Sequence, residues 1–373
     1  MKSHFNLPLT ALLFLIFQCA QPPAFSQDVM KGDREIDFPD IPGYHSLICD
    51  LHMHTVFSDG KVWPAIRVEE ALRDGLDVIS VTDHLEYQPH QDDIPHPDRN
   101  RSYQLAREAA SRSGLIVING TEITRSMPPG HFNALFVEDA NALNQEDVMD
   151  VFREAKRQGA FVFWNHPHWT AQRSDGVAKL SDMHIKLLEE ELFNGIEIYN
   201  HTTYSDEALE IAGSYELTIL GNSDIHGLID WQYPWQKGEH RPVTLAFSQE
   251  RSPESVKEAL VEKRTAVWFD QTLVGNEDFL VPLIEQSLGI TRHPGGEVVT
   301  LEIENRSSSD FMLENHSPYT LHNHAGVIVL KAHEKRTIQV KTIEKMKVFT
   351  LKFKVLNAFT SPDTHPMITL IIQ

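Results

Sequence analysis

Cysteine is almost absent from this chain, whose 373 residues include two, Cys19 and Cys49. Cys19 lies in an N-terminal segment that we expect to be removed, so the mature chain would form no internal disulfide. A centre built on several thiolates is excluded as well. Cys49 follows the apolar residues Leu47 and Ile48, and we expect it to be a small core residue.

Positive charge is also scarce, because 33 Lys and Arg residues stand against 53 Asp and Glu residues, which gives a formal net charge of −20. Binding to a polyanion needs basic patches, so this balance argues against a nucleic-acid partner. It does not exclude a small anionic substrate, because a bound metal ion dominates the local field of a buried site. The hydrophobic fraction of 41% and the charged fraction of 23% are typical of a folded, soluble protein.

Long apolar runs are missing beyond the N-terminus, so we expect no membrane span. Lys2 and the apolar stretch 7–17 have the composition and length of a secretory signal peptide. The sequence Ala24-Phe25-Ser26 offers small residues at the spacing that signal peptidase prefers, which predicts cleavage before Gln27 and export to the periplasm or outside the cell. Residues 16–18 depart from the small residue that a lipobox needs before Cys19, which favours a signal peptide over a lipid anchor.

The signatures of several other chemistries are lacking: there is no G-x-S-x-G, no phosphate-binding G-x-x-x-x-G-K and no dinucleotide fingerprint. The chain instead has Asp50-Leu51-His52-Met53-His54 at the end of an apolar run. In a strand, residues two apart share a face, so the imidazoles of His52 and His54 should point the same way. Asp59 follows, and Thr82-Asp83-His84 closes the next apolar run, which indicates a metal pocket.

The same pattern recurs along the chain, since successive apolar runs end in residues that can bind a metal. An alternating β/α barrel with its site at the carboxyl ends of the strands explains this repetition. The later runs lead into Gly120-Thr121-Glu122, Asn165-His166-Pro167-His168, Tyr199-Asn200 and Asn222-Ser223-Asp224-Ile225-His226.

Segments with helical spacing lie between these runs, and several end at a glycine such as Gly75, Gly114 or Gly159. Ser252-Pro253 supplies an N-cap and a proline at the first helical position. Strand, loop and helix repeated in this order indicate a parallel sheet wrapped by helices. The predicted helices cover residues 63–74, 103–113, 144–158, 181–192, 205–215 and 252–263, and a strand covers residues 265–269.

The order D-L-H-x-H, S-D-G, T-D-H, G-x-E, G-H, N-H-P and S-D-x-H resembles the PHP (polymerase and histidinol phosphatase) superfamily over residues 48–270. The resemblance implies an α/β fold, namely a distorted (β/α)7 TIM-like PHP barrel. It also implies two or three divalent metal ions at the carboxyl ends of the strands. The activity that it implies is hydrolysis of phosphate esters.

The ligands are implied by position in the same way. Carboxylates can bridge two metals and imidazoles cannot, and metals about 3.5–4 Å apart need such a bridge. The mixed N/O donors favour manganese, iron or zinc. The implied groups are His52, His54 and Asp224 for one metal, the bridging Glu122 with His131 and His166 for the second, and Asp59, His84 and His226 for the third.

Other residues are candidates for supporting roles. Arg125 is our candidate cation for the phosphoryl oxygens, with Arg264 as a second, and Asp83 would orient an imidazole rather than bind metal. His168 is a candidate substrate contact, and Glu197 either supports a ligand or packs at the barrel rim. Further aromatics near the ligands could line the substrate or belong to the core. The histidines that match no motif are expected to be solvated: His45, His90, His96, His184, His201, His240 and His293.

These features predict an exported metal-dependent phosphoesterase that uses a metal-bridging hydroxide on a small phosphomonoester or phosphodiester. Two alternatives stay open, a non-catalytic binding protein on a PHP barrel and a hydrolase of a non-phosphate bond. The sequence fixes neither the metal nor the substrate.

Beyond the barrel the pattern changes to alternating strands, as in Val298 to Glu304. We expect a small antiparallel β domain there, which would pack on the barrel or form a homo-oligomer. His322 and His324 form a His-x-His in it but have no carboxylate nearby in the sequence. The predicted organisation is a signal peptide at 1–26, a barrel at 44–275 and a C-terminal β-sandwich-like domain at 290–373.

Overall fold

The structure of the protein, a computed structural model, describes residues 35–342 and 344–373. The predicted signal peptide at residues 1–26 and Cys19 lie outside this part of the chain. None of the helices within the described residues is long and apolar enough to cross a membrane.

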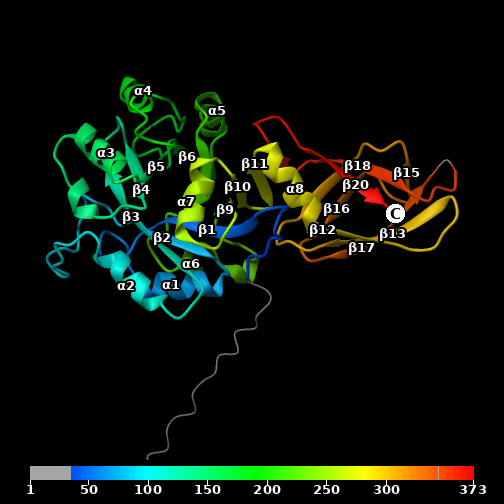
Figure 1. The fold of residues 1–373 in the computed structure, drawn as a ribbon, viewed down its shortest axis with the longest axis horizontal. Coiled ribbons are helices and arrows are strands. Elements are labelled where there is room, and N and C mark those ends of the chain that lie inside the picture. The colour runs from blue at the N-terminus through cyan, green and yellow to red at the C-terminus, as the bar shows by residue number, and fades with distance from the viewer. Residues whose placement is uncertain (1–34, 343) are drawn as a thin grey trace, which may run out of the picture. The chain divides into compact units, whose positions relative to one another are not determined.

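The N-terminal part of the described chain is built on a curled, 12-stranded mixed sheet with helices flanking it (Figure 1). Along the sheet the order is β19-β11-β10-β9-β1-β2-β3-β4-β5-β6-β7, and β8 pairs with β6. The strands are β1 (His45–Met53), β2 (Val78–Val81), β3 (Ile116–Thr124), β4 (His131–Leu135), β5 (Phe161–Trp164), β6 (Gly195–Asn200), β7 (Thr203–Tyr204), β8 (Thr218–Asn222), β9 (Val243–Ser248), β10 (Thr265–Phe269), β11 (Thr272–Gly275) and β19 (Ala358–Phe359).

The expected barrel is confirmed, but the expectation of a wholly parallel sheet was wrong. β1, β2 and β3 run parallel, as do β5, β6 and β8, whereas β4 is antiparallel to both of its neighbours. A short loop joins β3 to β4, and such a connection permits only an antiparallel pair. β10 and β11 also pair antiparallel, through a two-residue turn in which Asp270 and Gln271 both have positive φ.

The helices start and stop where the sequence supplies caps. Ser205, Ser252 and Asp147 each accept a backbone N–H at a helix start, and Gly75 and Gly159 take positive φ just after helix ends. The predicted helix at 144–158 begins later, because Asp147 caps it and a 3-10 turn precedes it. The helices are α1 (Pro64–Arg73), α2 (Arg101–Ala109), α3 (Val148–Arg157), α4 (Asp182–Glu189), α5 (Asp206–Tyr215), α6 (Ile229–Gln232), α7 (Pro253–Val261) and α8 (Glu277–Ser287), with 3-10 turns η1 (Ala140–Leu143) and η2 (Trp235–Lys237).

The structure confirms the expected burial of Cys49 and contradicts the expected exposure of His184. Cys49 is fully buried among Leu47, Leu51 and Val78, as predicted for a core residue. His184 on α4 was expected to be solvated, and this was wrong, because it is 0% exposed. Its ring packs against Trp164 with a centroid distance of 4.1 Å.

The C-terminal part forms two antiparallel four-stranded sheets, as the alternating pattern predicted. Side chains such as Leu301 and Phe353, one from each sheet, belong to one buried cluster. β19, which lies between two strands of the second sheet in the sequence, leaves the domain and pairs in parallel with β11 of the barrel sheet, which the sequence did not reveal. The first sheet has β12 (Leu288–Arg292), β13 (Val298–Asn305), β17 (Lys335–Lys341) and β15 (Thr320–His322), and the second has β16 (Val327–Leu330), β14 (Phe311–Asn315), β18 (Phe349–Val355) and β20 (Met367–Ile372).

Candidate metal centre

The structure brings all of the predicted metal ligands together at one end of the barrel sheet. Most of them follow the carboxyl end of a strand, where parallel strands place their loops. His131 reaches the same end from the first residue of β4, because that strand is antiparallel. The contributions are His52, His54 and Asp59 from β1 and its loop, His84 after β2, Glu122 on β3, His131 on β4, His166 after β5, and Asp224 and His226 after β8.

The first group of donor atoms has the spacing of a metal-binding set. His52 Nε2 lies 3.1 Å from His54 Nε2 and 3.2 Å from Asp224 Oδ1, and His54 Nε2 lies 3.0 Å from that oxygen. The carboxylate of Glu122 approaches the two imidazoles at 3.7 and 3.5 Å. Donors placed tetrahedrally at about 2.0–2.1 Å from zinc are separated by about 3.3–3.4 Å. These separations therefore fit a common ion.

Glu122 also belongs to the second group. Its Oε1 lies 3.0 Å from His131 Nδ1 and 3.5 Å from His166 Nε2. The Glu122 side chain is fully buried, and one carboxylate thus faces imidazoles of both groups. This is the position that a bridging ligand needs.

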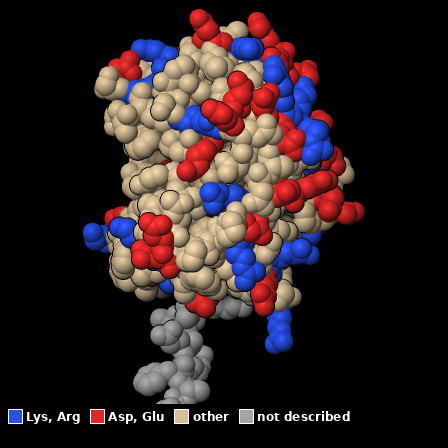
Figure 2. All heavy atoms as spheres, turned by 90° about the vertical axis from the view of Figure 1, so that its left-hand side faces the viewer, with Lys and Arg blue, Asp and Glu red and all other residues tan. Residues whose placement is uncertain are grey.

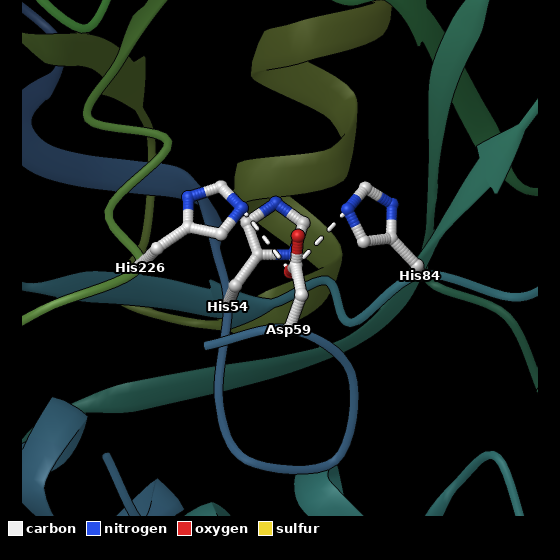
Figure 3. Close-up of side chains that lie close together, drawn as sticks. All are labelled: His54, Asp59, His84 and His226. Carbon is white, nitrogen blue, oxygen red and sulfur yellow. Dashed lines mark ion pairs between the residues drawn. The ribbon is translucent and has the colours of Figure 1, made fainter. Parts of the chain in front are cut away.

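Asp59 is the centre of the third group, in which His226 and His84 flank it and His54 lies behind (Figure 3). Asp59 Oδ1 is 3.2 Å from His226 Nε2 and 3.4 Å from His84 Nε2. The loop that carries Asp59 packs tightly on β1: a Cβ at Gly60 would lie 2.5 Å from the backbone nitrogen of Thr55. Glycine at this position therefore allows Asp59 to approach the imidazoles.

Hydrogen bonds hold two of the imidazoles with Nε2 directed at the centre. The Nδ1–H of His52 donates to Glu197, and that of His226 donates to the carbonyl of Asp224. His84 Nδ1 lies 2.6 Å from both the Thr124 hydroxyl and Glu122 Oε2. A histidine that donates one ring N–H to the protein keeps its other nitrogen as a lone-pair donor for a metal. The tautomers that these bonds select are therefore those that metal binding requires.

The carboxylates of the centre are held in their ionised form. Burial by itself would raise the pKa of Glu122, but the neighbouring His84 and His131 bring that pKa well below its ordinary value. Burial likewise opposes ionisation of Asp59, and hydrogen bonds from His226 and His84 lower its pKa. Ionised carboxylates and imidazole nitrogens form a hard-to-borderline donor set, which suits divalent transition metals.

Two of the candidate ligands have strained backbones. His166 has φ 29° and Asp224 has φ 50°, values that disfavour residues with a side chain. Backbone hydrogen bonds hold both: the His166 N–H donates to Glu197 at 2.8 Å, and the Asp224 N–H donates to the His52 carbonyl at 2.9 Å. Such strain is typical of residues whose side chains must reach a functional site.

The residues predicted to support the metal ligands have different surroundings in the structure. Asp83 accepts hydrogen bonds from the backbone and hydroxyl of Thr55 and from the Ser58 hydroxyl, which lies 3.4 Å from His54 Nδ1. It thus fixes the loop beside His54 rather than binding an imidazole directly. His168 lines a cavity that opens beside the metal centre.

The two candidate cations do not line that cavity. Arg125 pairs with Glu86 at 2.8 Å and donates to the carbonyls of Gln145 and Glu146. Arg264 donates to the Phe247 carbonyl and pairs with Glu258. Their guanidinium groups therefore hold loops and strands together, and the structure gives neither a place beside a phosphoryl group.

Sequence reasoning missed several residues that shape the site. Thr124 lies two residues beyond Glu122 on β3, so strand alternation could have placed it on the same face. Asp50 accepts hydrogen bonds from the hydroxyl and N–H of Ser223, next to Asp224, and pairs with the buried Arg241. No local pattern links Arg241 to residues so far away in the sequence.

A cavity of about 360 Å³ opens beside the centre. It offers room for a small ligand within reach of the candidate ligands. Its lining residues are His84, Glu122, His131, His166, His168, Trp169, Asn200, His201, Thr203 and Asp224.

The barrel and the histidine- and carboxylate-rich centre at its strand ends are features of metal-dependent hydrolases. A solved structure from Bacteroides vulgatus ATCC 8482, a two-domain protein containing a predicted PHP-like metal-dependent phosphoesterase, is 44% identical with a TM-score of 0.84. That likeness covers 91% of this chain and 98% of the other. The chain therefore belongs to the family of PHP-like metal-dependent phosphoesterases, which are hydrolases.

Other comparisons are more distant or partial. A protein of Bifidobacterium adolescentis ATCC 15703 that is proposed to be a metal-dependent phosphoesterase is 19% identical, with a TM-score of 0.38 over 49% of this chain and 89% of its own. PsfC from Pseudomonas syringae PB-5123 is 17% identical, with a TM-score of 0.41 over 60% of this chain and 92% of its own. Residues 287–371 match the family model of an Ig-like domain. No curated protein matches the chain.

Proposed function

We propose that the protein binds two or three divalent metal ions at this centre and hydrolyses a small phosphomonoester. The observation that carries the proposal is the position of Glu122, whose buried carboxylate lies within 3.7 Å of ring nitrogens of His52, His54, His131 and His166 and 2.6 Å from His84 Nδ1. A shared carboxylate between two sets of imidazoles is the arrangement that a multi-metal phosphoesterase uses.

The proposed ligands follow the donor groups. His52, His54 and Asp224 would hold one ion, and Glu122 would join it to a second, held by His131 and His166. Asp59, His84 and His226 would hold a third. Bound ions of this kind lower the pKa of a coordinated water and neutralise charge on the phosphoryl oxygens. The N/O donor set supports manganese, iron or zinc.

The remaining residues of the site prepare it for this chemistry. Glu197 fixes the ring of His52 and the backbone of His166, and Asp83 fixes the loop that carries Ser58. With Arg125 engaged elsewhere, no arginine or lysine of residues 35–342 and 344–373 lines the cavity. The metals themselves would therefore have to balance the charge of the substrate.

The cavity of about 360 Å³ favours a small phosphate ester. We take the monoester, which carries a single group on its phosphate, as the first candidate. A nucleic-acid substrate is disfavoured by the net charge of −20. On the face shown in Figure 2, acidic and basic side chains are interspersed, which is not the clustering that binding to a polyanion requires.

The first test is metal content by mass spectrometry on the chain from Gln27 onwards, with hydrolysis of nitrophenyl phosphomonoester and diester. We expect two or more transition metals per chain and faster turnover of the monoester. The double variant His52→Ala/His54→Ala should lose both metal and turnover. His322→Ala/His324→Ala, which removes the other His-x-His, is the matched control and should keep both.

The outcomes separate the alternatives. Absence of stoichiometric metal after reconstitution would refute the mechanism and support a binding role. Full metal occupancy without hydrolysis of either ester would point to another bond, such as an amide, as the target of the same centre. Preferred hydrolysis of the diester would correct the substrate class.

We also propose that the chain is exported, supported by Lys2, the apolar stretch 7–17 and the small residues before Gln27. N-terminal sequencing of the protein from an expressing cell should then begin at Gln27. A lipid-labelled chain that begins at Cys19 would show anchoring instead.

A further inference from the structure

Beyond the proposed metal ligands, the cavity is lined by His168, Trp169, Asn200, His201 and Thr203. Within the part of the chain that the structure describes, this wall therefore includes no lysine, arginine, aspartate or glutamate. A substrate with a second phosphate or a carboxylate would find no cation there. The metal centre would bind one phosphoryl group, and a neutral remainder of the ligand would match this wall.

A chain of hydrogen bonds sets which of these groups donate and which accept. The Thr203 hydroxyl donates to the backbone carbonyl of Asn200 at 3.0 Å. It therefore accepts the Nε2–H of His168 at 2.8 Å. His168 Nδ1 is consequently an acceptor. It is buried and has no hydrogen-bond partner within residues 35–342 and 344–373, and the side chain is 9% exposed.

Asn200 adds a second acceptor. Its amide nitrogen donates to Glu197 at 2.8 Å, which leaves the side-chain carbonyl oxygen for another partner. Buried polar atoms normally have hydrogen-bond partners, so the unpaired Nδ1 of His168 calls for a donor on a ligand. Hydroxyl groups are neutral donors of this kind.

An aromatic ring completes the wall. The ring centroid of Trp169 lies 5.1 Å from that of His166 and 5.7 Å from that of His131. Trp169 is nevertheless 45% exposed. An exposed indole beside fixed acceptors suits a ligand that has hydroxyls at its edges and C–H groups on its face.

We propose, on the basis of the phosphomonoesterase function above, that the substrate is the phosphate ester of a monosaccharide or polyol. The hydroxyls of the sugar or polyol would donate to His168 Nδ1 and to the side-chain oxygen Oδ1 of Asn200. Its C–H face would lie on the indole ring of Trp169. In the reaction water adds to phosphorus and the ester P–O bond breaks. The water's proton passes to the leaving oxygen, so inorganic phosphate and the free sugar or polyol are released.

A substrate pair of equal carbon count tests the proposal on the metal-loaded chain. Glycerol 1-phosphate carries two hydroxyls that propyl phosphate lacks, and we expect its kcat/KM to be at least about tenfold higher, because a site built for a hydroxyl rejects an analogue without it. Glucose 6-phosphate should likewise be preferred over adenosine 5′-monophosphate and fructose 1,6-bisphosphate. Nitrophenyl phosphate reports the phosphomonoesterase activity itself.

The two proposals fail in different ways. Turnover of nitrophenyl phosphate with equal use of propyl and glycerol phosphates, or with preference for the nucleotide or bisphosphate, would overturn the sugar or polyol proposal alone. Absence of turnover with every ester, despite bound metal, would overturn the phosphomonoesterase proposal and this one with it.

A variant tests the wall directly. Thr203→Val removes the acceptor that fixes His168, so the ratio of kcat/KM for glycerol 1-phosphate over propyl phosphate should fall about tenfold, mainly through a higher KM for glycerol 1-phosphate. Thr369→Val makes the same change at an exposed position on β20 and should leave the ratio unchanged. An unchanged ratio in a Thr203→Val protein that retains its metal would contradict the proposal.

Discussion

The Nδ1–H of His52 donates to Glu197 Oε1 at 2.9 Å, and neither side chain has any exposed surface. The same carboxylate accepts the backbone N–H of His166 and the amides of Asn200 and Asn222. Glu197 thus organises candidate ligands of two metals from one buried position. Although burial opposes protonation of His52, Asp224 and Glu197 hold the pKa of its imidazole well above the ordinary value, which shows how strongly these carboxylates act on it.

Replacing Glu197 by glutamine should weaken metal binding by about 10–100-fold, the usual cost of losing the partner of a metal-binding histidine. The amide would lose the negative charge and place an NH2 group against N–H donors. Competition with a chelator on the metal-loaded protein measures the affinity. Glu189→Gln, at an exposed position on α4, is the control and should bind metal as the native chain does. Equal metal affinities of the two variants would show that Glu197 does not support metal binding.

Glu122 should be more sensitive than any single histidine, because its carboxylate faces several imidazoles. We expect Glu122→Gln to lower kcat/KM for nitrophenyl phosphate on the order of 10³-fold, since a bridging charge that supports several kcal/mol of catalysis is lost. Metal analysis of the same sample should show fewer ions per chain. Glu302→Gln on β13 serves as the control. Retention of full metal content and turnover would show that Glu122 is not a bridge.

The ligands were predictable because two regularities reinforce each other. Residues at the ends of neighbouring strands meet at one edge of a sheet, and alternation puts His52 and His54 on one side. Strand alternation would also have argued against Arg125, since it lies an odd number of residues from Glu122 and so points to the other face. His184 shares a helix face with Leu187, a signal of burial that its polarity concealed.

Other features could not be predicted because they depend on long-range packing. Thr203 meets His168 only after β6 turns back through β7, and Arg241 meets Asp50 because it precedes β9, the antiparallel neighbour of β1. Likewise, β19 joins the barrel sheet from within the C-terminal domain. Local sequence patterns contain no information on such partners.

The buried ion cluster around Arg241 should be essential for stability. Its guanidinium is 0% exposed and lies 3.0 Å from Asp50 and 2.7 Å from Asp74. Arg241→Met removes the buried cation that pairs with Asp50 and Asp74, which should cost about 3–5 kcal/mol of unfolding free energy. Arg251→Met removes a pair with Asp77 at a half-exposed position and should cost less than about 1 kcal/mol. Urea unfolding of both variants checks the contrast, and similar losses would contradict it.

His184 provides a prediction about pH. Its Nε2–H donates to the Pro129 carbonyl at 2.7 Å, while Nδ1 accepts the N–H of Ser181 at 3.1 Å. A second proton on this ring would displace the bond from Ser181. Burial lowers the pKa of His184 to about 4, opposed by the bond to Pro129 and assisted by Arg173.

Because the pKa in the folded chain lies below the ordinary value of about 6.5, the unfolded chain binds more protons between these limits. The contribution of His184 to stability is therefore complete above about pH 6.5 and is lost as the pH falls towards 4, by up to about 3 kcal/mol. Urea unfolding of the native chain and of His184→Asn at intervals from pH 7 to pH 4 measures it. The metal-site histidines are the same in both proteins, so the difference between the two curves isolates His184. That difference should shrink as the pH falls, and a constant difference would show that His184 gains its proton equally in the folded and unfolded chains.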